Sequence, residues 1–176
     1  MSLRSVRRLL ASTGMVGAAV LVLAASALPV QAADFIPIEV FGAITNFNGQ
    51  CLEDPNGSTQ PGVQAVVNPC NGLPRQQWAL VLFDTSDLRM IQNGRSGLCL
   101  SILNDFTGVG GRVVQESCNS SDRFQHWKMI DQTTIGFEFA NNGDGGLVMH
   151  PALCTSATGA EIYMNVSGQC RVDFWH

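Results

Sequence analysis

The sequence predicts an all-β fold built from three copies of one four-stranded unit, and two observations carry this prediction. Tryptophans recur at a nearly constant spacing, because Trp127 follows Trp78 by 49 residues and Trp175 follows Trp127 by 48. The apolar runs between them are short, are separated by Gly, Asn, Asp and Pro, and lack the 3.6-residue period of a substantial helix. Self-similarity at a fixed period indicates a repeated structural unit.

The tryptophans belong to a repeated motif. "NGLPRQQW" ends at Trp78 and "SDRFQHW" ends at Trp127, so each has a Gln two residues before the Trp. The chain ends in "RVDFWH", where Asp173 takes the place of that Gln before Trp175. A Gln amide can satisfy backbone groups of the preceding turn, and a Trp in three equivalent strands buries a large apolar surface. We therefore predict that the three tryptophans are core residues and not platforms for a ligand.

Cysteines fall in phase with the motif in the first two copies. The two cysteines of each copy are 19 residues apart, Cys51 with Cys70 and Cys99 with Cys118. In this register "ITNFNGQCL" aligns with "IQNGRSGLCL", with one residue inserted before the Cys.

A third copy aligns when Trp175 is laid on Trp127. "FANNGDGGLV" then takes the place of "IQNGRSGLCL", which puts Leu147 at the first Cys position and Val166 at the second. The predicted repeats cover about residues 37–84, 85–132 and 133–176.

Each copy is predicted to contain four short strands bounded by turn residues. In chain order they are Pro37–Ile44, Gln50–Glu53, Val63–Asn68 and Gln77–Phe83, then Leu88–Ile91, Leu98–Ile102, Arg112–Ser117 and His126–Asp131, then Ile135–Ala140, Gly146–His150, Ala160–Asn165 and Asp173–His176. Short strands with turn signals about every ten residues indicate a barrel or a sandwich. Three copies of four strands favour a β-trefoil, because one such unit cannot bury its apolar face alone.

The first 32 residues are predicted to be a secretory signal peptide. Arg4, Arg7 and Arg8 form a basic start, an apolar run follows, and small residues lead to a cleavage site after Ala32. The run is shorter than the roughly 20 residues that a membrane-spanning helix needs. We expect an exported protein with no membrane span, whose domain covers residues 33–176.

Charge and composition narrow the possible partners of this exported part. Removing the three arginines of the signal leaves 7 of 10 basic residues against 14 acidic ones, a net charge of −7. Nucleic acids and anionic lipids need a basic surface, so neither is expected as a partner. No nucleophile, base and orienting group come together in the sequence, and His126, His150 and His176 are scattered. We therefore expect neither an enzyme nor a cofactor.

Six cysteines in an exported chain predict three disulfides. Number alone allows fifteen pairings. The repeat symmetry selects Cys51–Cys70 and Cys99–Cys118, and this leaves Cys154–Cys170. A metal site would need closer clusters and suitably placed histidines, which the chain lacks.

The first copy, "GQCLEDPNGSTQPGVQAVVNPCNGLPRQQW", resembles a repeat of the ricin B-chain (R-type) lectins. That family's pattern is Cys-Leu-Asp, a Gly, a short strand, a second Cys and Gln-x-Trp. The resemblance runs from about Pro37 to the C-terminus. It implies a β-trefoil that binds carbohydrate, of galactose type or related to it.

The resemblance also implies which side chains would hold a sugar. The family uses a carboxylate after Cys-Leu, an aromatic on the third strand, and a polar pair that opens Gln-x-Trp. The candidate carbohydrate-binding residues of the first copy are Glu53, Asp54, Asn68, Asn71, Arg75 and Gln76. They include no aromatic platform, although Phe47, Phe106 and Tyr163 could reach a site from another direction.

The other two copies depart further from the family's pattern. The second has Ser101 and Glu116 at the carboxylate and aromatic positions, and the third has Met149 and Met164. We therefore predict one weak site, in the first copy, while solvated turn residues remain the alternative interpretation there.

Two functions stay open after these observations. The first is a secreted carbohydrate-binding module that acts mainly through the first copy. The second is a non-catalytic interaction protein on the same fold, such as the cell-binding subunit of a toxin or an inhibitor, which has a protein partner and degenerate sugar sites.

Overall fold

The computed structural model describes residues 36–37, 41–82, 86–133, 136–155, 157–169 and 175. The chain divides into two units, residues 1–32 and 33–176. All described residues belong to the second unit, so the predicted signal peptide lies outside them. Within the described ranges, no helix has both the length and the apolar character that crossing a membrane requires.

The predicted all-β fold is confirmed. The described residues form eleven strands, which are β1 (Ile36–Pro37), β2 (Gln50–Glu53), β3 (Val66–Pro69), β4 (Trp78–Leu82), β5 (Leu88–Asn93), β6 (Cys99–Ile102), β7 (Val113–Glu116), β8 (Trp127–Thr133), β9 (Gly136–Asn141), β10 (Val148–Pro151) and β11 (Ala160–Asn165). The helical elements among them are single 3₁₀ turns, η1 (Pro55–Gly57), η2 (Pro74–Gln76), η3 (Leu103–Asp105), η4 (Arg123–Gln125) and η5 (Ala152–Cys154).

The ends of the chain fit the predicted strands less closely. Where one strand was predicted for Pro37–Ile44, the structure has the two-residue β1 and then an isolated bridge from Gly42 to Trp78. Most of the predicted strand Asp173–His176 lies outside the described residues. Its one described residue, Trp175, forms antiparallel bridges to Asn46 and Phe137.

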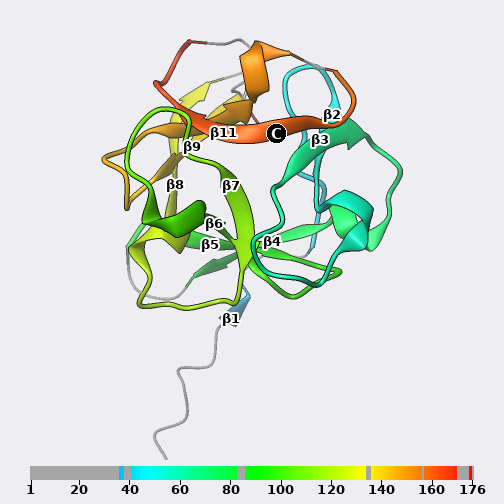
Figure 1. The fold of residues 1–176 in the computed structure, drawn as a ribbon, viewed down its shortest axis with the longest axis horizontal. Coiled ribbons are helices and arrows are strands. Elements are labelled where there is room, and N and C mark those ends of the chain that lie inside the picture. The colour runs from blue at the N-terminus through cyan, green and yellow to red at the C-terminus, as the bar shows by residue number, and fades with distance from the viewer. Residues whose placement is uncertain are drawn as a thin grey trace, which may run out of the picture. The chain divides into compact units, whose positions relative to one another are not determined.

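Antiparallel pairing joins each copy to the next. The strand that begins at a motif tryptophan pairs with the first strand of the following copy, β4 with β5 and β8 with β9. The bridge from Trp175 to Asn46 returns the third copy to the first and so closes the ring. The second and third strands of each copy form the hairpins β2–β3, β6–β7 and β10–β11. Figure 1 shows β3, β7 and β11, one from each copy, around the centre of the described unit.

The motif tryptophans lie in the core, as predicted. Trp78 is 2% exposed, and Trp127 and Trp175 are fully buried. Each indole Nε1–H donates to a backbone carbonyl oxygen of the preceding hairpin, at 2.9 Å to Leu52, 3.1 Å to Leu100 and 3.2 Å to Met149. A buried indole therefore keeps its one hydrogen bond, and its ring packs into the main hydrophobic cluster of all three copies.

These three hydrogen bonds correct the predicted register of the third copy. They make Met149 the equivalent of Leu52 and Leu100, so the first Cys position belongs to Val148 and not to Leu147. Strand pairing agrees, because Val148 lies opposite Ala140 as Cys99 lies opposite Gln92. The loop before β10 is therefore one residue longer than the alignment assumed.

The turns that follow these strands confirm the corrected register. Asn56, Asn104 and Leu153 each lie four residues after the equivalent of Leu52 and adopt left-handed φ angles of 60°, 56° and 54°. Met149 and Met164 are fully buried, so the prediction that they occupy the carboxylate and aromatic positions of the third copy is wrong. The positions that correspond to Glu53 and Asn68 are His150 and Asn165, because Asn165 pairs with Val148 as Asn68 pairs with Cys51.

Two of the three predicted disulfides are present. Cys51 is bonded to Cys70 and Cys99 to Cys118, and each bond ties the start of a hairpin to the loop that leaves it. Cys154 is also in a disulfide, but its predicted partner Cys170 lies outside the described residues. The Cys154–Cys170 bridge therefore stays a prediction.

Candidate functional site

Glu53 is the centre of a polar cluster in the first copy. It is the last residue of β2 and is only 3% exposed. Asn68 Nδ2 donates to its Oε1 at 3.0 Å and Gln76 Nε2 donates to its Oε2 at 2.5 Å. Arg75 Nε lies 3.1 Å from Oε1, which makes an ion pair, although the N–H direction does not meet hydrogen-bond geometry. Four of the six candidate residues therefore meet at one carboxylate.

Gln76 also stabilises the fold. It is fully buried, its Oε1 accepts from the Asn71 backbone N–H at 2.7 Å, and its Nε2 donates to the Pro69 carbonyl at 3.0 Å. Gln125 makes the same two backbone contacts in the second copy, with Asn119 at 2.9 Å and Ser117 at 3.0 Å. The Gln of the motif thus closes its turn in both copies, and only the first copy adds a carboxylate partner.

Asn71 lies at the edge of this arrangement. Its side chain is exposed, and its Oδ1 accepts from the Leu73 backbone N–H at 3.0 Å. The contact of Asn71 with Gln76 is made by its backbone only. The structure therefore places Asn71 in the turn next to the Glu53 cluster and not in the cluster itself.

Asp54 is directed toward the second copy. It is 1% exposed, and its Oδ1 accepts from Gln115 Nε2 at 2.7 Å. Its Oδ2 is buried without a hydrogen-bond partner. Burial raises the pKa of Asp54 to about 7, and the charge of Glu53 adds to the shift while the Gln115 hydrogen bond opposes it. The described contacts of Asp54 lie within the protein, and its contact with a sugar stays a prediction.

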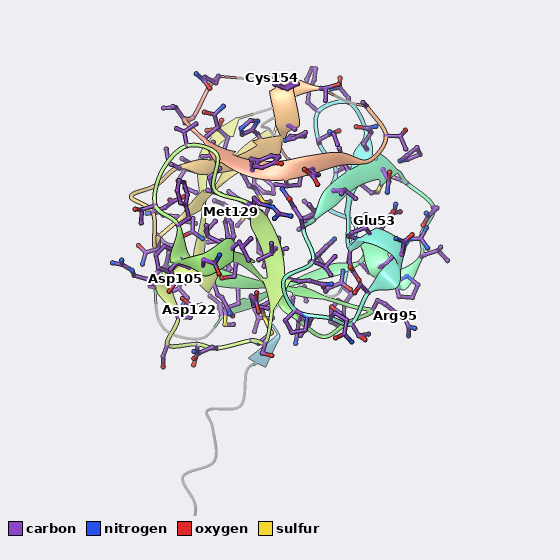
Figure 2. The ribbon with its side chains drawn as sticks, in the orientation of Figure 1. Glu53, Arg95, Asp105, Asp122, Met129 and Cys154 are labelled. Atoms are coloured by element: carbon purple, nitrogen blue, oxygen red, sulfur yellow. A yellow bond between two sulfur atoms is a disulfide. The ribbon has the colours of Figure 1, made fainter. Side chains whose placement is uncertain are left out.

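A pocket of about 310 Å³ opens beside the Glu53 cluster. Its lining comes from η1, η2 and the turn after β5, and comprises Asn56, Gly57, Leu73, Pro74, Arg75 and Arg95. Leu73 is 44% exposed and offers an apolar surface, while the two arginines offer donors. Figure 2 shows Glu53 and Arg95 on the same side of the described unit. Sugar recognition needs such a mixture of polar and apolar groups.

The turn after β5 holds both pocket arginines through one buried side chain. Asn93 Nδ2 donates to the Arg75 carbonyl at 3.1 Å, and Asn93 Oδ1 accepts from the backbone N–H of Arg95 at 2.8 Å. Asn93 itself is fully buried. The backbone of both arginines is therefore fixed before any ligand arrives.

Among the residues that the structure describes, the second and third copies show no equivalent cluster. Ser101 is buried at the position of Glu53, and Glu116 is half-buried at the position of Asn68. His150 takes the Glu53 position in the third copy, and burial lowers its pKa. A second pocket, of about 250 Å³, is lined by residues of the second copy that include the half-exposed Phe106 and Arg112. Arg112 Nε already donates to Gln64 Oε1 at 2.6 Å, so this N–H has a partner within the protein.

Sequence reasoning missed the residues that the second copy contributes to this region. Arg95 lines the pocket, Asn93 fixes it, and Gln115 holds Asp54. An Asn recurs at the position of Asn93 in the other copies, as Asn46 and Asn141, and this recurrence could have indicated a structural role. Asn141 Nδ2 also donates to a backbone carbonyl, that of Phe124, at 2.7 Å. In the part of the chain that the structure describes, no three His, Cys, Asp or Glu residues are grouped as metal ligands would be.

Comparisons with known proteins agree with the fold described above. A family model for the ricin-type β-trefoil lectin domain matches residues 40–170. A 74-residue segment is 28% identical to one of the subunits of the cytolethal distending toxin of Campylobacter jejuni. That match covers 42% of this chain and 25% of the toxin subunit, so it spans a quarter of the relative's length.

Solved structures with the same fold include a designed protein and an enzyme. ThreeFoil, a designed threefold-symmetric protein, has a TM-score of 0.71 at 20% identity, over 77% of this chain and 96% of its own. An exo-β-1,3-galactanase from Clostridium thermocellum has a TM-score of 0.73 at 22% identity, over 80% of this chain and 30% of its own. At these identities the likeness shows the β-trefoil fold alone.

Proposed function

The chain belongs to the ricin-type β-trefoil lectin domain family, and from this we propose that it is a non-catalytic carbohydrate-binding protein. The observation that supports this proposal is the Glu53 cluster beside an open pocket in the first copy. A buried carboxylate with three polar partners is a costly arrangement for a turn. Holding ligand-binding side chains in place is a function that fits this cost.

The cluster changes the role that we propose for Glu53. Its oxygens already accept from Asn68 and Gln76 and pair with Arg75. Glu53 would therefore orient Arg75 at the pocket rim, and ligand hydroxyls would bind to Arg75, Arg95 and Asn56 while a ring face packs on Leu73. The pocket has no aromatic platform, so we expect millimolar affinity, about 4 kcal/mol, at one site per chain.

We further propose that the protein is exported. The basic start and apolar run of residues 1–32 support this, as do the two described disulfides, because disulfides persist in oxidising compartments.

The Glu53→Ala variant is expected to weaken sugar binding at least about tenfold, because Arg75 loses its anchoring charge. A glycan array identifies the ligand, and titration of the mature protein measures its affinity and stoichiometry. The matched control is Ser101→Ala, at the equivalent position of the second copy, which should bind normally. Near-UV circular dichroism verifies that both variants are folded.

A second function, as an interaction protein with a protein partner, is favoured by one separate observation. A 74-residue segment of the chain is similar to a subunit of the cytolethal distending toxin, and the described residues of the second and third copies show no counterpart of the Glu53 cluster. Normal binding by Glu53→Ala, or two to three equivalent sites per chain, would contradict the proposed first-copy site. Complete absence of glycan binding would leave the interaction function as the better account.

A further inference from the structure

Two of the few basic side chains in this acidic chain line the same pocket. The predicted mature chain has 7 basic residues, which is 10 minus Arg4, Arg7 and Arg8, against 14 acidic ones. Arg75 comes from η2 of the first copy and Arg95 from the turn after β5 in the second copy. Residues 20 positions apart are thus brought to one cavity by the pairing of β4 with β5.

The turn at Gly57 lies beside both arginines. A Cβ placed on Gly57 would lie 3.5 Å from Arg95 Cγ, 3.7 Å from Arg95 Nε and 3.9 Å from Arg75 Cβ. Gly57 also has a φ of 65°, which a side chain disfavours. The side of Gly57 without a side chain therefore faces both arginines, and Asn93 forms a hydrogen bond with the backbone of each.

The charges of the two arginines are balanced unequally. Arg75 is paired with Glu53, and its side chain is 31% exposed. Arg95 is exposed, and within the described part of the chain its guanidinium has no hydrogen bond or ion pair. Asp54 is the second carboxylate near them, and burial disfavours its charge. At or below about pH 7, where at least half of Asp54 is protonated, the two carboxylates therefore neutralise the charge of the two arginines only in part.

We propose that the pocket between Arg75 and Arg95 binds a saccharide that carries an anionic group, a carboxylate or a sulfate. This inference rests on the proposed carbohydrate-binding function and names the ligand class of its pocket. A planar guanidinium donates two parallel hydrogen bonds to a carboxylate or sulfate, and such charge-assisted bonds are about twice as strong as neutral ones. Leu73 and Pro74 supply the apolar wall on which the sugar ring packs.

The test compares matched acidic and neutral sugars by NMR titration of the ¹⁵N-labelled mature protein. The probes are methyl glucuronide against methyl glucoside, and galactose 6-sulfate against galactose, at low and constant ionic strength. We expect at least one acidic sugar to bind about tenfold more tightly than its neutral counterpart. Sodium acetate and sodium sulfate alone should bind more weakly than that sugar, and the two pairs of probes distinguish a carboxylate from a sulfate.

Arg95→Gln should weaken binding of the acidic sugar about tenfold and that of the neutral sugar less, because Gln keeps a hydrogen-bond donor but loses the charge, so the two sugars of a pair should then bind within about twofold of each other. The control is Arg123→Gln, which removes the same charge from an exposed arginine that lies over Phe124 in η4, away from the pocket lining. About 0.5 M NaCl should reduce the preference, because the pocket is open to solvent.

The remaining outcomes separate this inference from the function on which it rests. Equal affinities for neutral and acidic sugars would contradict the preference for an anionic group and leave the proposed carbohydrate binding intact. Failure of all sugars to bind would overturn both. If Arg95→Gln kept the preference for the acidic sugar, the site would not be this pocket. If acetate or sulfate alone bound as tightly as the acidic sugar, the ligand would be a simple anion and not a saccharide.

Discussion

At pH 8, the Asp54→Asn variant is expected to be more stable than the wild type by about 2–4 kcal/mol, whereas at pH 4 the two should differ little. Burial raises the pKa of Asp54 from 3.8 to about 7, so the folded protein binds this proton more tightly than the unfolded chain does. Stability from this group is complete below about pH 4 and is lost as pH rises through about 7. Asn keeps an oxygen that accepts from Gln115 and carries no charge to bury.

The difference between variant and wild type is the quantity to measure, because other groups also titrate. The pKa of Asp144 is raised to about 6 by burial and adds a slope of the same sign. The pKa of His150 is lowered by burial, so its contribution has the opposite sign, present at high pH and lost as pH falls. These contributions are common to both proteins and cancel when urea unfolding is compared at each pH.

An exposed carboxylate provides the control for the Asp54 substitution. Asp105→Asn makes the same chemical change at an exposed position of η3. It should alter stability by less than about 0.5 kcal/mol at either pH. The interpretation of Asp54 would be wrong if Asp54→Asn were less stable than the wild type at pH 8, or if its effect were equal at pH 4 and pH 8.

The same titration should affect the ligand of the first-copy pocket. The charged and polar groups that act on Asp54 are Glu53 beside it, Arg75 from η2, Arg95 from the turn after β5 and Gln115 from β7. Protonation of Asp54 removes a negative charge near the two arginines, so an anionic sugar should bind about two- to threefold more tightly at pH 6 than at pH 8. Both sugar anions stay ionised over this range. Equal affinities at pH 6 and pH 8 would show that the charge of Asp54 does not affect the ligand of this pocket.

The sequence predicts the fold well because the residues that set it recur at fixed spacing. Trp78 and Trp127 each need a carbonyl acceptor from their own copy, and Cys51–Cys70 and Cys99–Cys118 fix the same hairpin twice. Such contacts lie within one copy, so a local pattern reveals them.

The Glu53 cluster was predictable for the same reason, whereas its surroundings were not. Glu53, Asn68 and Gln76 lie within 23 positions of one another in a single copy. Gln115 reaches Asp54 across 61 positions, and Arg95 joins the pocket from the second copy. These contacts exist only after the copies have paired, and no motif in one copy specifies them.

The third copy shows where alignment without a structure fails. Its hairpin loop, "NNGDGG", has two adjacent Asn and three Gly residues, so the sequence gives no sign of where the inserted residue lies. Alternate side chains of a strand point to opposite faces, so an error of one residue moves every side chain of β10 to the wrong side. The predicted place of Met149 at the carboxylate position is wrong for this reason, and the hydrogen bond from Trp175 to its carbonyl shows the error.

The Met149→Ala variant is therefore expected to lose about 2–5 kcal/mol of stability, although Met149 lies outside the candidate site. Its side chain is fully buried in the cluster that contains Trp175, and it lies across the strand pair from the fully buried Met164. Truncation leaves a cavity that these neighbours fill only in part. Met129→Ala is the control, because Met129 is partly buried against the same cluster and should cost less than half as much. Urea unfolding with the disulfides intact measures both losses. A Met149→Ala variant within about 0.5 kcal/mol of the wild type would contradict the burial of Met149 and the corrected register of the third copy.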